Sequence, residues 1–267
     1  MPDACSVALV DRQEMPSAGW ASLLSDRERA EASTYRHPVR RARTMTSRVL
    51  AKYLVIRPDA FGFRRLSARD IAPVSRHSEW TSVELLSGTA GARGRATVFR
   101  DGLAFSDLSV SSSHCGTQTA ACVSRGWRVG LDLERIEPRR QEFYANTFSA
   151  EERNWVEGMR PFAGASTDAA FTLLWSIKEA YLKASGRPDI SVWTFPRWTV
   201  RFDGAVDRML RPEGARGLVG VSGGIHSHGF SQAVDIAGMR VGDMILAAVQ
   251  YQESDTLALQ CREANDE

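Results

Sequence analysis

The segment from Asp168 to Ser185 limits the fold of this chain more than any other. Its apolar residues spread around much of a helical cylinder, and they are Phe171, Leu173, Leu174, Trp175, Ile177, Tyr181 and Leu182. Gly186 and then Pro188 follow, and residues of these two types commonly end a helix. A helix with apolar side chains on most of its surface is stable only when other elements bury that surface. The pattern therefore predicts a largely buried helix with other elements packed around it.

A strand with strict alternation is the second strong signal, from Trp127 to Glu134. Its apolar positions are Trp127, Val129, Leu131 and Leu133, and Asp132 and Glu134 lie between and after them. Successive side chains of a strand point to opposite faces, so the apolar set is expected in the core. Both carboxylates then share the other face of the strand.

Several shorter patterns place further elements. Ser25 with Glu28, and Ser149 with Glu152, have the spacing of a capping box and predict two helix starts. Pro38 suits the first turn of a helix whose basic residues lie mostly off the apolar stripe, namely Arg40, Arg43, Arg48 and Lys52. The run from Met244 to Val249 predicts a buried strand.

Composition bounds the class of protein. With 267 residues, 43% hydrophobic and 25% charged, the chain has room for one large domain or two modest ones. No apolar run approaches the roughly 18 residues of a membrane span, and the first ten residues lack the pattern of a secretory signal. The cysteines are far apart, at Cys5, Cys115, Cys122 and Cys261. This spacing argues against a disulfide scaffold or a zinc site and favours the reducing cytoplasm.

The charge is divided unevenly along the chain. The net charge is +2, but there are 17 basic and 12 acidic residues up to Val110, against 17 and 20 after it. Arginine binds phosphate well, so a phosphorylated small molecule is one explanation for the basic part. A solvated helix face is the simpler one. No basic stripe interleaved with aromatic residues accompanies the excess, so we do not expect nucleic acid as a partner.

Two pairs of charged residues can carry chemistry. Asp132 and Glu134 repel each other unless one is protonated or a hard cation such as magnesium lies between them. Taken alone, the pair is explained more simply as two solvated acids at a strand edge. Glu179 and Lys183 share one helix face and can form a surface salt bridge. Because their helix is mostly apolar, we expect Lys178, Glu179 and Lys183 to meet a cleft instead.

The segment from Ser111 to Gly116 ends a strand with three serines, a histidine, a cysteine and a glycine. Small hydroxyl residues before His114 and a glycine allow a backbone to approach an anion and donate to it. Cys115 points to the opposite strand face from its neighbour His114, so it is expected to be a small core residue and not a nucleophile.

Together and in order, three motifs closely resemble those of the surfactin-type 4′-phosphopantetheinyl transferases. They are Ser113-His114-Cys115-Gly116, Gly130-Leu131-Asp132-Leu133-Glu134 and Trp175-Ser176-Ile177-Lys178-Glu179-Ala180-Tyr181-Leu182-Lys183. The segment from Leu24 to Leu54 is also similar to the front of that family. Gly94-Arg95 matches a family turn except that Ala96 replaces its proline. The resemblance covers most of the chain and thins after about Phe202.

The resemblance implies an α+β fold of two similar α/β halves, related by a pseudo-twofold, with the active site at their interface. Residues 1–116 would form the half that binds the adenosine and phosphates of coenzyme A. Residues 117–267 would carry the metal site and the catalytic helix. A single chain of this length would supply both halves, which implies a monomer.

The implied reaction transfers the 4′-phosphopantetheine group of coenzyme A to a serine of an acyl or peptidyl carrier protein, releasing 3′,5′-ADP, with Mg²⁺ as cofactor. Asp132, Glu134 and Glu179 would hold the metal, and Glu179 is the candidate general base unless it is only a ligand. Lys183, with Lys178 second, would bind the pyrophosphate. The adenosine end would be held by Arg43, Arg95, Ser113 and His114, with Arg29 a looser assignment from the same basic region.

Two other functions remain compatible with these residues. A magnesium-dependent hydrolase could use the same three acids on a nucleotide pyrophosphate without any carrier protein. A non-catalytic protein could bind coenzyme A or a carrier protein. The sequence does not identify the carrier or the pathway it serves.

Overall fold

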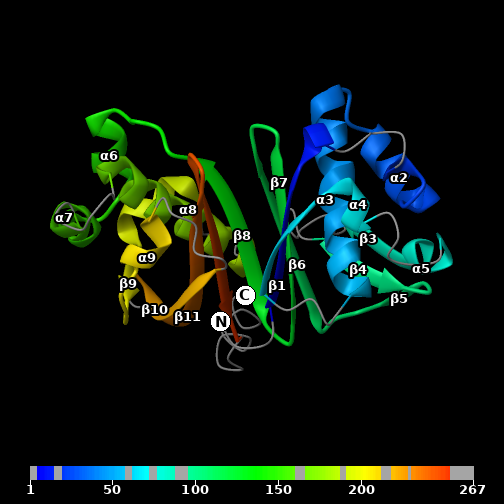
Figure 1. Cartoon of the computed structure of the whole chain (residues 1–267). Coiled ribbons are helices and arrows are strands. Elements are labelled where there is room, and N and C mark those ends of the chain that lie inside the picture. Colours follow the sequence, from blue (N-terminus) through cyan, green and yellow to red (C-terminus); the bar gives the residue numbers. More distant parts are fainter. Residues whose placement is uncertain are drawn as a thin grey trace.

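A computed structural model describes residues 5–14, 20–57, 62–71, 77–87, 96–159, 166–186, 191–211, 218–227 and 230–252. The fold is α+β, as predicted, and it has two lobes (Figure 1). Pro188, which we expected to follow the end of the buried helix, lies outside the described residues.

The N-terminal lobe contains two sheets. The first has the strand order β2-β1-β7-β6, with β2 parallel to β1 and the other pairs antiparallel. Its strands are β1 (Cys5–Asp11), β2 (Gly62–Leu66), β6 (Leu108–Cys115) and β7 (Gln118–Arg125). The second is β3 (Val83–Ser87), β4 (Ala96–Arg100) and β5 (Leu103–Ala104). The helical elements are η1 (Arg12–Glu14), α2 (Asp26–Ser33), α3 (Pro38–Ile56), α4 (Ala68–Ile71) and α5 (His77–Ser82).

The C-terminal lobe has one antiparallel sheet in the order β8-β12-β11-β10-β9. Its strands are β8 (Arg128–Arg135), β9 (Thr199–Phe202), β10 (Val219–Ser227), β11 (Phe230–Val241) and β12 (Met244–Tyr251). Its helical elements are α6 (Gln141–Thr147), α7 (Ala150–Met159), α8 (Thr167–Ser185), η2 (Val192–Arg197) and α9 (Asp207–Leu210). Among the described residues, no helix is both long enough and apolar enough to cross a membrane.

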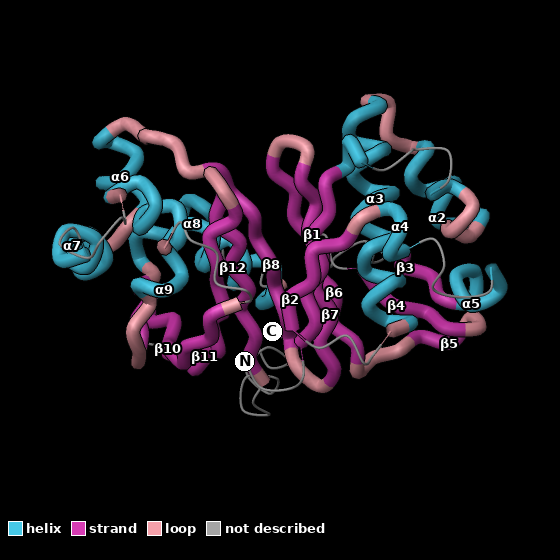
Figure 2. The backbone as a smooth tube through the Cα atoms, viewed as in Figure 1, coloured by secondary structure: helices cyan, strands magenta, loops and turns pink. Residues whose placement is uncertain are grey.

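The lobes pack sheet against sheet, with a long helix on each outer side (Figure 1). Helix α3 covers the N-terminal lobe's larger sheet, and α8 covers β8 and β12. An apolar layer lies between the two sheets and includes Val7, Leu9, Leu131, Leu133 and Leu246. Figure 2 shows strands β1, β2, β6, β7, β8 and β12 in the middle of the molecule, with the long helices outside them and β3–β5 near α5 at the right.

The lobes meet at a seam, which we define as the line where β6 runs beside β8. Serine side chains of β6 bridge the strands here: the backbone N–H of Val129 donates to Ser109 Oγ, and that of Leu131 donates to Ser111 Oγ, each at 3.0 Å. These hydroxyls give partners to backbone groups on the edge of β8, which would otherwise be buried without one. The alternating serines of β6 therefore join the two lobes closely.

Both lobes repeat one local arrangement. The predicted capping boxes form at Ser25 with Glu28 and at Ser149 with Glu152. In each lobe the capping-box glutamate is buried and binds a lysine of the long helix, Lys52 or Lys178. The two lobes thus share this local arrangement, as the sequence resemblance implied, although their sheets differ in strand number and direction.

The long helix and the alternating strand are confirmed. Helix α8 ends at Ser185, followed by Gly186 in the left-handed conformation (φ 58°), and most of its residues are buried. In β8 the predicted core residues Val129, Leu131 and Leu133 are buried, whereas Trp127 lies just before the strand and is only half-buried. The opposite face is also covered, and Asp132 is only 3% exposed. The reason is that α8 lies over that face.

Two expectations are corrected. The predicted division at residue 116 falls in the turn between β6 and β7, and both strands belong to the first sheet. The division between the lobes comes later, between β7 and β8. The basic residues of α3 are also not all on a solvated face: Arg48 is 6% exposed and Lys52 is fully buried. Arg48 donates a hydrogen bond to the backbone carbonyl of Glu28, and Lys52 donates one to the Glu28 carboxylate.

Candidate active site

A glycine allows α8 to lie directly on β8. A Cβ atom added at Gly130 would be 1.8 Å from the carbonyl oxygen of Ala180 and 2.8 Å from the backbone nitrogen of Ala184. Any side chain at this position would therefore overlap the helix backbone. The contact brings the polar face of β8 within reach of Glu179 and Lys183.

Lys183 links the helix, the strand and the seam. Its Nζ donates to Asp132 Oδ1 at 2.7 Å, to the Leu131 carbonyl at 3.0 Å and to Ser113 Oγ at 3.2 Å. Ser113 in turn donates to Asp132 Oδ1 at 3.0 Å. Residues from three elements, α8, β8 and β6, thus meet at the Asp132 carboxylate.

Asp132, Glu134 and Glu179 form what we call the carboxylate cluster. Burial, followed by the charges of Asp132 and Glu134, raises the pKa of Glu179 to about 7, although Lys183 acts in the opposite direction. Burial and the charge of Asp132 also raise the pKa of Glu134. Glu134 and Glu179 are therefore both harder to ionise than free glutamates, and an added positive charge nearby would favour their ionised forms.

The chemistry of this cluster fits a divalent cation. Asp132 Oδ2 is buried and has no hydrogen-bond partner among the described residues. A buried carboxylate oxygen without a partner is unfavourable and is suited to a metal. Within the described parts of the chain, however, no three His, Cys, Asp or Glu side chains come together closely enough to hold a metal ion. One or two carboxylates are the usual protein share of a magnesium site that also includes phosphate oxygens and water.

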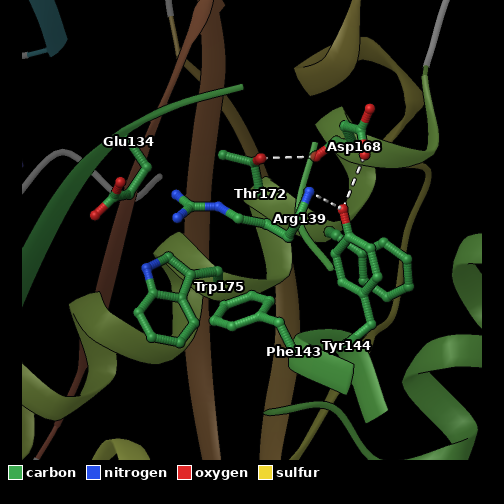
Figure 3. A pocket seen from close by; sticks show the side chains of 8 residues that line it. Glu134, Arg139, Phe143, Tyr144, Asp168, Thr172 and Trp175 are labelled. Atoms are coloured by element: carbon green, nitrogen blue, oxygen red, sulfur yellow. Dashed lines mark hydrogen bonds between the residues drawn. The ribbon is translucent and has the colours of Figure 1, made fainter. Parts of the chain in front are cut away.

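Glu134 lines a small aromatic recess (Figure 3). The recess has a volume of about 10 Å³, room for roughly one water molecule. Arg139 lies over the ring of Phe143 at 5.6 Å and extends its guanidinium toward Glu134. A hydrogen bond with Trp175 and the charge of Arg139 both oppose the rise in the pKa of Glu134. Arg139 is a nearby cation that the sequence patterns did not single out.

A larger cavity of about 380 Å³ lies between α3, β6 and the end of α8. We call it the anion cavity because four of its lining residues are cationic: Arg40, Arg43, Arg48 and Lys183. Hydroxyl groups of Thr44, Ser47, Ser111 and Ser112 add hydrogen-bonding capacity. The Nε atom of Arg43 is buried and has no hydrogen-bond partner within the described chain. Arg43 therefore lines the cavity with a guanidinium group that has an unsatisfied donor, which suits a ligand with negative charge.

His114 lines the same cavity. Partial burial, then the charges of Arg43, Arg12 and Lys183, lower its pKa to about 4. The imidazole is therefore neutral at neutral pH in the absence of an anion. A bound phosphate would offset these cations and raise the pKa of His114.

The structure brings together most of the predicted site residues. Asp132, Glu134, Glu179 and Lys183 meet at the β8–α8 contact, Ser113 joins them, and Arg43 and His114 line the adjoining anion cavity. Arg95 lies outside the described residues. Arg40 and Arg48 line the cavity but were not predicted as site residues; their helical spacing with Arg43 and Ser47 was the available signal.

Lys178 does not face the cleft, contrary to expectation. It is 3% exposed, and its Nζ donates to Glu152 and to the carbonyls of Phe195 and Trp198. Its protons are thus already used within the C-terminal lobe. Arg29 is also not at the site, because its guanidinium binds the Ala21 carbonyl at 2.9 Å, the Leu24 carbonyl and Asp26.

Comparison with known proteins concerns the C-terminal lobe. Residues 128–214 match the family model of the 4′-phosphopantetheinyl transferase superfamily. The match begins with β8 and contains α8, so it includes the carboxylate cluster and Lys183, but it does not extend to α3 or β6. No curated protein matches the chain.

Proposed function

We propose that this protein transfers the 4′-phosphopantetheine group of coenzyme A to a serine of an acyl or peptidyl carrier protein and releases 3′,5′-ADP. The observation that carries the proposal is a pair of buried, unpartnered atoms of opposite polarity. Arg43 Nε requires an acceptor, and Asp132 Oδ2 requires a proton or a cation. Lys183 connects their surroundings, because it lines the cavity of Arg43 and binds Asp132. A diphosphate with a bound cation would satisfy both.

The anion cavity suits the phosphorylated nucleotide end of coenzyme A. Its volume of about 380 Å³ is typical of a small-molecule site. Arg40, Arg43 and His114 would bind the 3′-phosphate and its neighbours, and Lys183 would bind the pyrophosphate nearer the seam. Arginine is suited to this role because its planar donors match phosphate oxygens.

Magnesium belongs to the proposal through the carboxylate cluster. We assign Asp132, Glu134 and Glu179 as its ligands, but these side chains are not gathered closely enough to form a site without phosphate oxygens and water. The bound ion would neutralise charge on the pyrophosphate and make it a better electrophile. The unpartnered Asp132 Oδ2 is the oxygen in this chain that supports this assignment best.

Glu179 is the proposed base for the transfer. A pKa of about 7 places its carboxylate near the pH at which a base is both available and effective. Glu179 would accept the proton of the carrier serine as that oxygen forms a bond to the phosphorus of the pantetheine arm. The bond from this phosphorus to the bridging oxygen breaks, and 3′,5′-ADP leaves with its charge balanced by Lys183.

The two similar lobes support the surfactin type of this reaction, in which one chain supplies both halves of the seam. A monomer and a cytoplasmic location form part of the same proposal. The free thiols of Cys5, Cys115 and Cys122 are consistent with a reducing compartment.

The deciding experiment incubates the purified protein with coenzyme A, Mg²⁺ and a panel of apo carrier proteins. We expect a mass gain equal to phosphopantetheine on at least one carrier, with release of 3′,5′-ADP. Glu179→Gln should lose the transfer, and a carrier with its acceptor serine replaced by alanine should remain unmodified. Consumption of coenzyme A without a carrier would indicate a hydrolase, and tight binding without turnover would indicate a binding protein. Either result would reject the proposal.

A further inference from the structure

Two buried ion pairs occupy corresponding places in the lobes and lie next to the two halves of the candidate site. We propose that Lys178 and Lys52 are positioning residues: Lys178 orients α8 so that Glu179 and Lys183 meet Asp132, and Lys52 orients α3 so that its arginines line the anion cavity. This inference rests on the proposed function for its kinetic consequences, but its structural part can be tested separately.

Lys178 connects α8 to three other elements. Its Nζ donates to Glu152 Oε2 at 2.6 Å, to the carbonyls of Phe195 and Trp198 at 2.8 Å, and more weakly to the carbonyl of Thr147 at 3.3 Å. These acceptors belong to α7, to η2 with the residue that follows it, and to the end of α6. An ammonium group has three protons, so these acceptors leave none for a ligand. The lysine thus ties α8 to these elements of the C-terminal lobe.

Glu152 extends this connection. Its Oε1 accepts from the backbone N–H of Val200 at 2.9 Å, and its Oε2 accepts from the N–H of Ser149 at 2.9 Å as well as from Lys178. The side chain is fully buried. Glu152 and Lys178 together therefore fix α8 relative to the start of α7 and to β9.

The position of Lys178 along the helix explains its importance for the site. It directly precedes Glu179, and Lys183 follows little more than one turn later. On the other side, Gly130 holds the helix against β8 without any intervening side chain. Rotation or sliding of α8 is therefore opposed by Lys178 on one side and by the backbone contact at Gly130 on the other. Misplacement of a catalytic group by about 1 Å can lower a rate about 100-fold.

The N-terminal lobe contains the corresponding pair. Lys52 Nζ donates to Glu28 Oε2 at 2.7 Å, and Glu28 Oε1 accepts from the N–H of Leu85 at 2.9 Å. Both side chains are fully buried. Arg48, which lines the anion cavity, donates to the Glu28 carbonyl at 2.7 Å. This pair therefore supports the binding side of the site.

The residues that follow the two lysines differ in chemistry between the lobes. Glu179 follows Lys178, whereas the buried Tyr53 follows Lys52. The same local arrangement thus holds a carboxylate in one lobe and a core residue in the other. Loss of either pair should damage a different step, although both pairs should matter similarly for folding.

The test compares matched variants: Glu152→Gln with Lys178→Met, and Glu28→Gln with Lys52→Met. Replacing both partners leaves no unpaired buried charge in either lobe. We expect the C-terminal double variant to lose about 100-fold in kcat with KM for coenzyme A changed less than about threefold. The N-terminal double variant should raise KM for coenzyme A about tenfold and keep kcat within about threefold. If both variants lose kcat equally, in proportion to their melting temperatures, the inference is wrong.

A milder pair of variants serves if a double variant does not fold. Glu152→Asp and Glu28→Asp keep the charge but shorten the side chain by one methylene group. We expect Glu152→Asp to lower kcat about tenfold and Glu28→Asp to raise KM for coenzyme A about threefold. Wild-type kcat in a folded Glu152→Asp protein with a lowered melting temperature would show a purely structural role.

A binding measurement separates this inference from the proposed function. Mn²⁺ added alone is titrated and followed by its paramagnetic resonance signal, with no carrier or coenzyme A present. The C-terminal variants should bind Mn²⁺ at least about tenfold more weakly than wild type, and the N-terminal variants should bind it as wild type does. A wild-type protein that modifies no carrier would refute the proposed function alone. Equal Mn²⁺ affinity in all variants would refute the positioning role of Lys178.

Discussion

Replacement of Gly130 by alanine tests whether the close contact between α8 and β8 creates the site. The new Cβ would lie 1.8 Å from the Ala180 carbonyl oxygen, 2.7 Å from its carbonyl carbon and 2.8 Å from the Ala184 nitrogen. These are backbone atoms, so no side-chain rotation relieves the overlap. Since real Cβ contacts are rarely shorter than about 3 Å, the helix must move outward by roughly 1 Å or more.

That movement acts directly on the hydrogen bonds of Lys183. At present its Nζ is 2.7 Å from Asp132 Oδ1 and 3.2 Å from Ser113 Oγ. An outward shift of about 1 Å would lengthen both beyond normal hydrogen-bond distances. We expect kcat to fall about 100-fold, since errors of this size in placement have such effects. Overpacking should also destabilise the protein by about 1–3 kcal/mol, which lowers Tm by roughly 2–12 °C for a chain of this size.

The assay measures carrier modification by mass spectrometry at varied coenzyme A, with Tm recorded for the same preparation. Gly158→Ala in α7 is the matched control, because a Cβ added there meets nothing within 4 Å. This control should retain activity and gain up to about 1 kcal/mol in stability from helix propensity. A Gly130→Ala protein with wild-type kcat and Tm would refute the argument that this contact positions Lys183.

Three further predictions concern charge. The pKa of about 7 for Glu179 predicts that kcat/KM rises with pH through neutrality, and Glu179→Gln should abolish transfer. The same substitution should raise Tm more at pH 8 than at pH 5. The reason is that ionisation of this buried acid destabilises the wild-type folded state as the pH rises through 7. A flat pH profile would argue against Glu179 as the base. Arg43→Ala should raise KM for coenzyme A at least about tenfold with little change in kcat, and calorimetry should show the same loss in affinity; unchanged affinity would remove Arg43 from the site. The pKa of His114, about 4 in the free protein, should rise when 3′,5′-ADP binds, because the phosphate offsets the neighbouring cations. An NMR titration of the imidazole measures this pKa with and without 3′,5′-ADP. An unchanged pKa would place the anion elsewhere.

The two lysines of the α8 motif illustrate the limit of sequence patterns. Lys178 and Lys183 are both in the motif, and the sequence led us to expect both at a cleft. In the structure Lys183 lines the anion cavity, whereas Lys178 is buried against Glu152. The assignment depends on a glutamate 26 residues earlier, whose side chain reaches α8 only in the folded lobe. No spacing within the helix records that contact.

The arginines of α3 show the opposite case, in which residues expected in solvent line a cavity. Their pattern predicted a mostly solvated face, but Arg48 is buried, and it lines the cavity with Arg40 and Arg43. The helical period places these residues relative to one another. It does not say that β6 and the end of α8 lie opposite them across the seam.

The sequence by itself determined the local structure and most of the chemistry. Capping boxes, the alternation of β8 and the apolar surface of α8 are local patterns, and their physical causes are also local: backbone hydrogen bonding and the period of each element. The carboxylates, Lys183 and His114 were singled out by the resemblance of their motifs to those of a known family.

Only the tertiary structure decided which of these groups meet. The contact of Gly130 with the backbone of Ala180, the serines of β6 along β8, and the buried lysine in each lobe join residues that are distant in sequence. Burial and charge at these contacts then set the properties that matter for function, including the pKa of about 7 at Glu179 and the unpartnered oxygen of Asp132. Such properties arise from the summed surroundings of a side chain in three dimensions, which no linear spacing specifies.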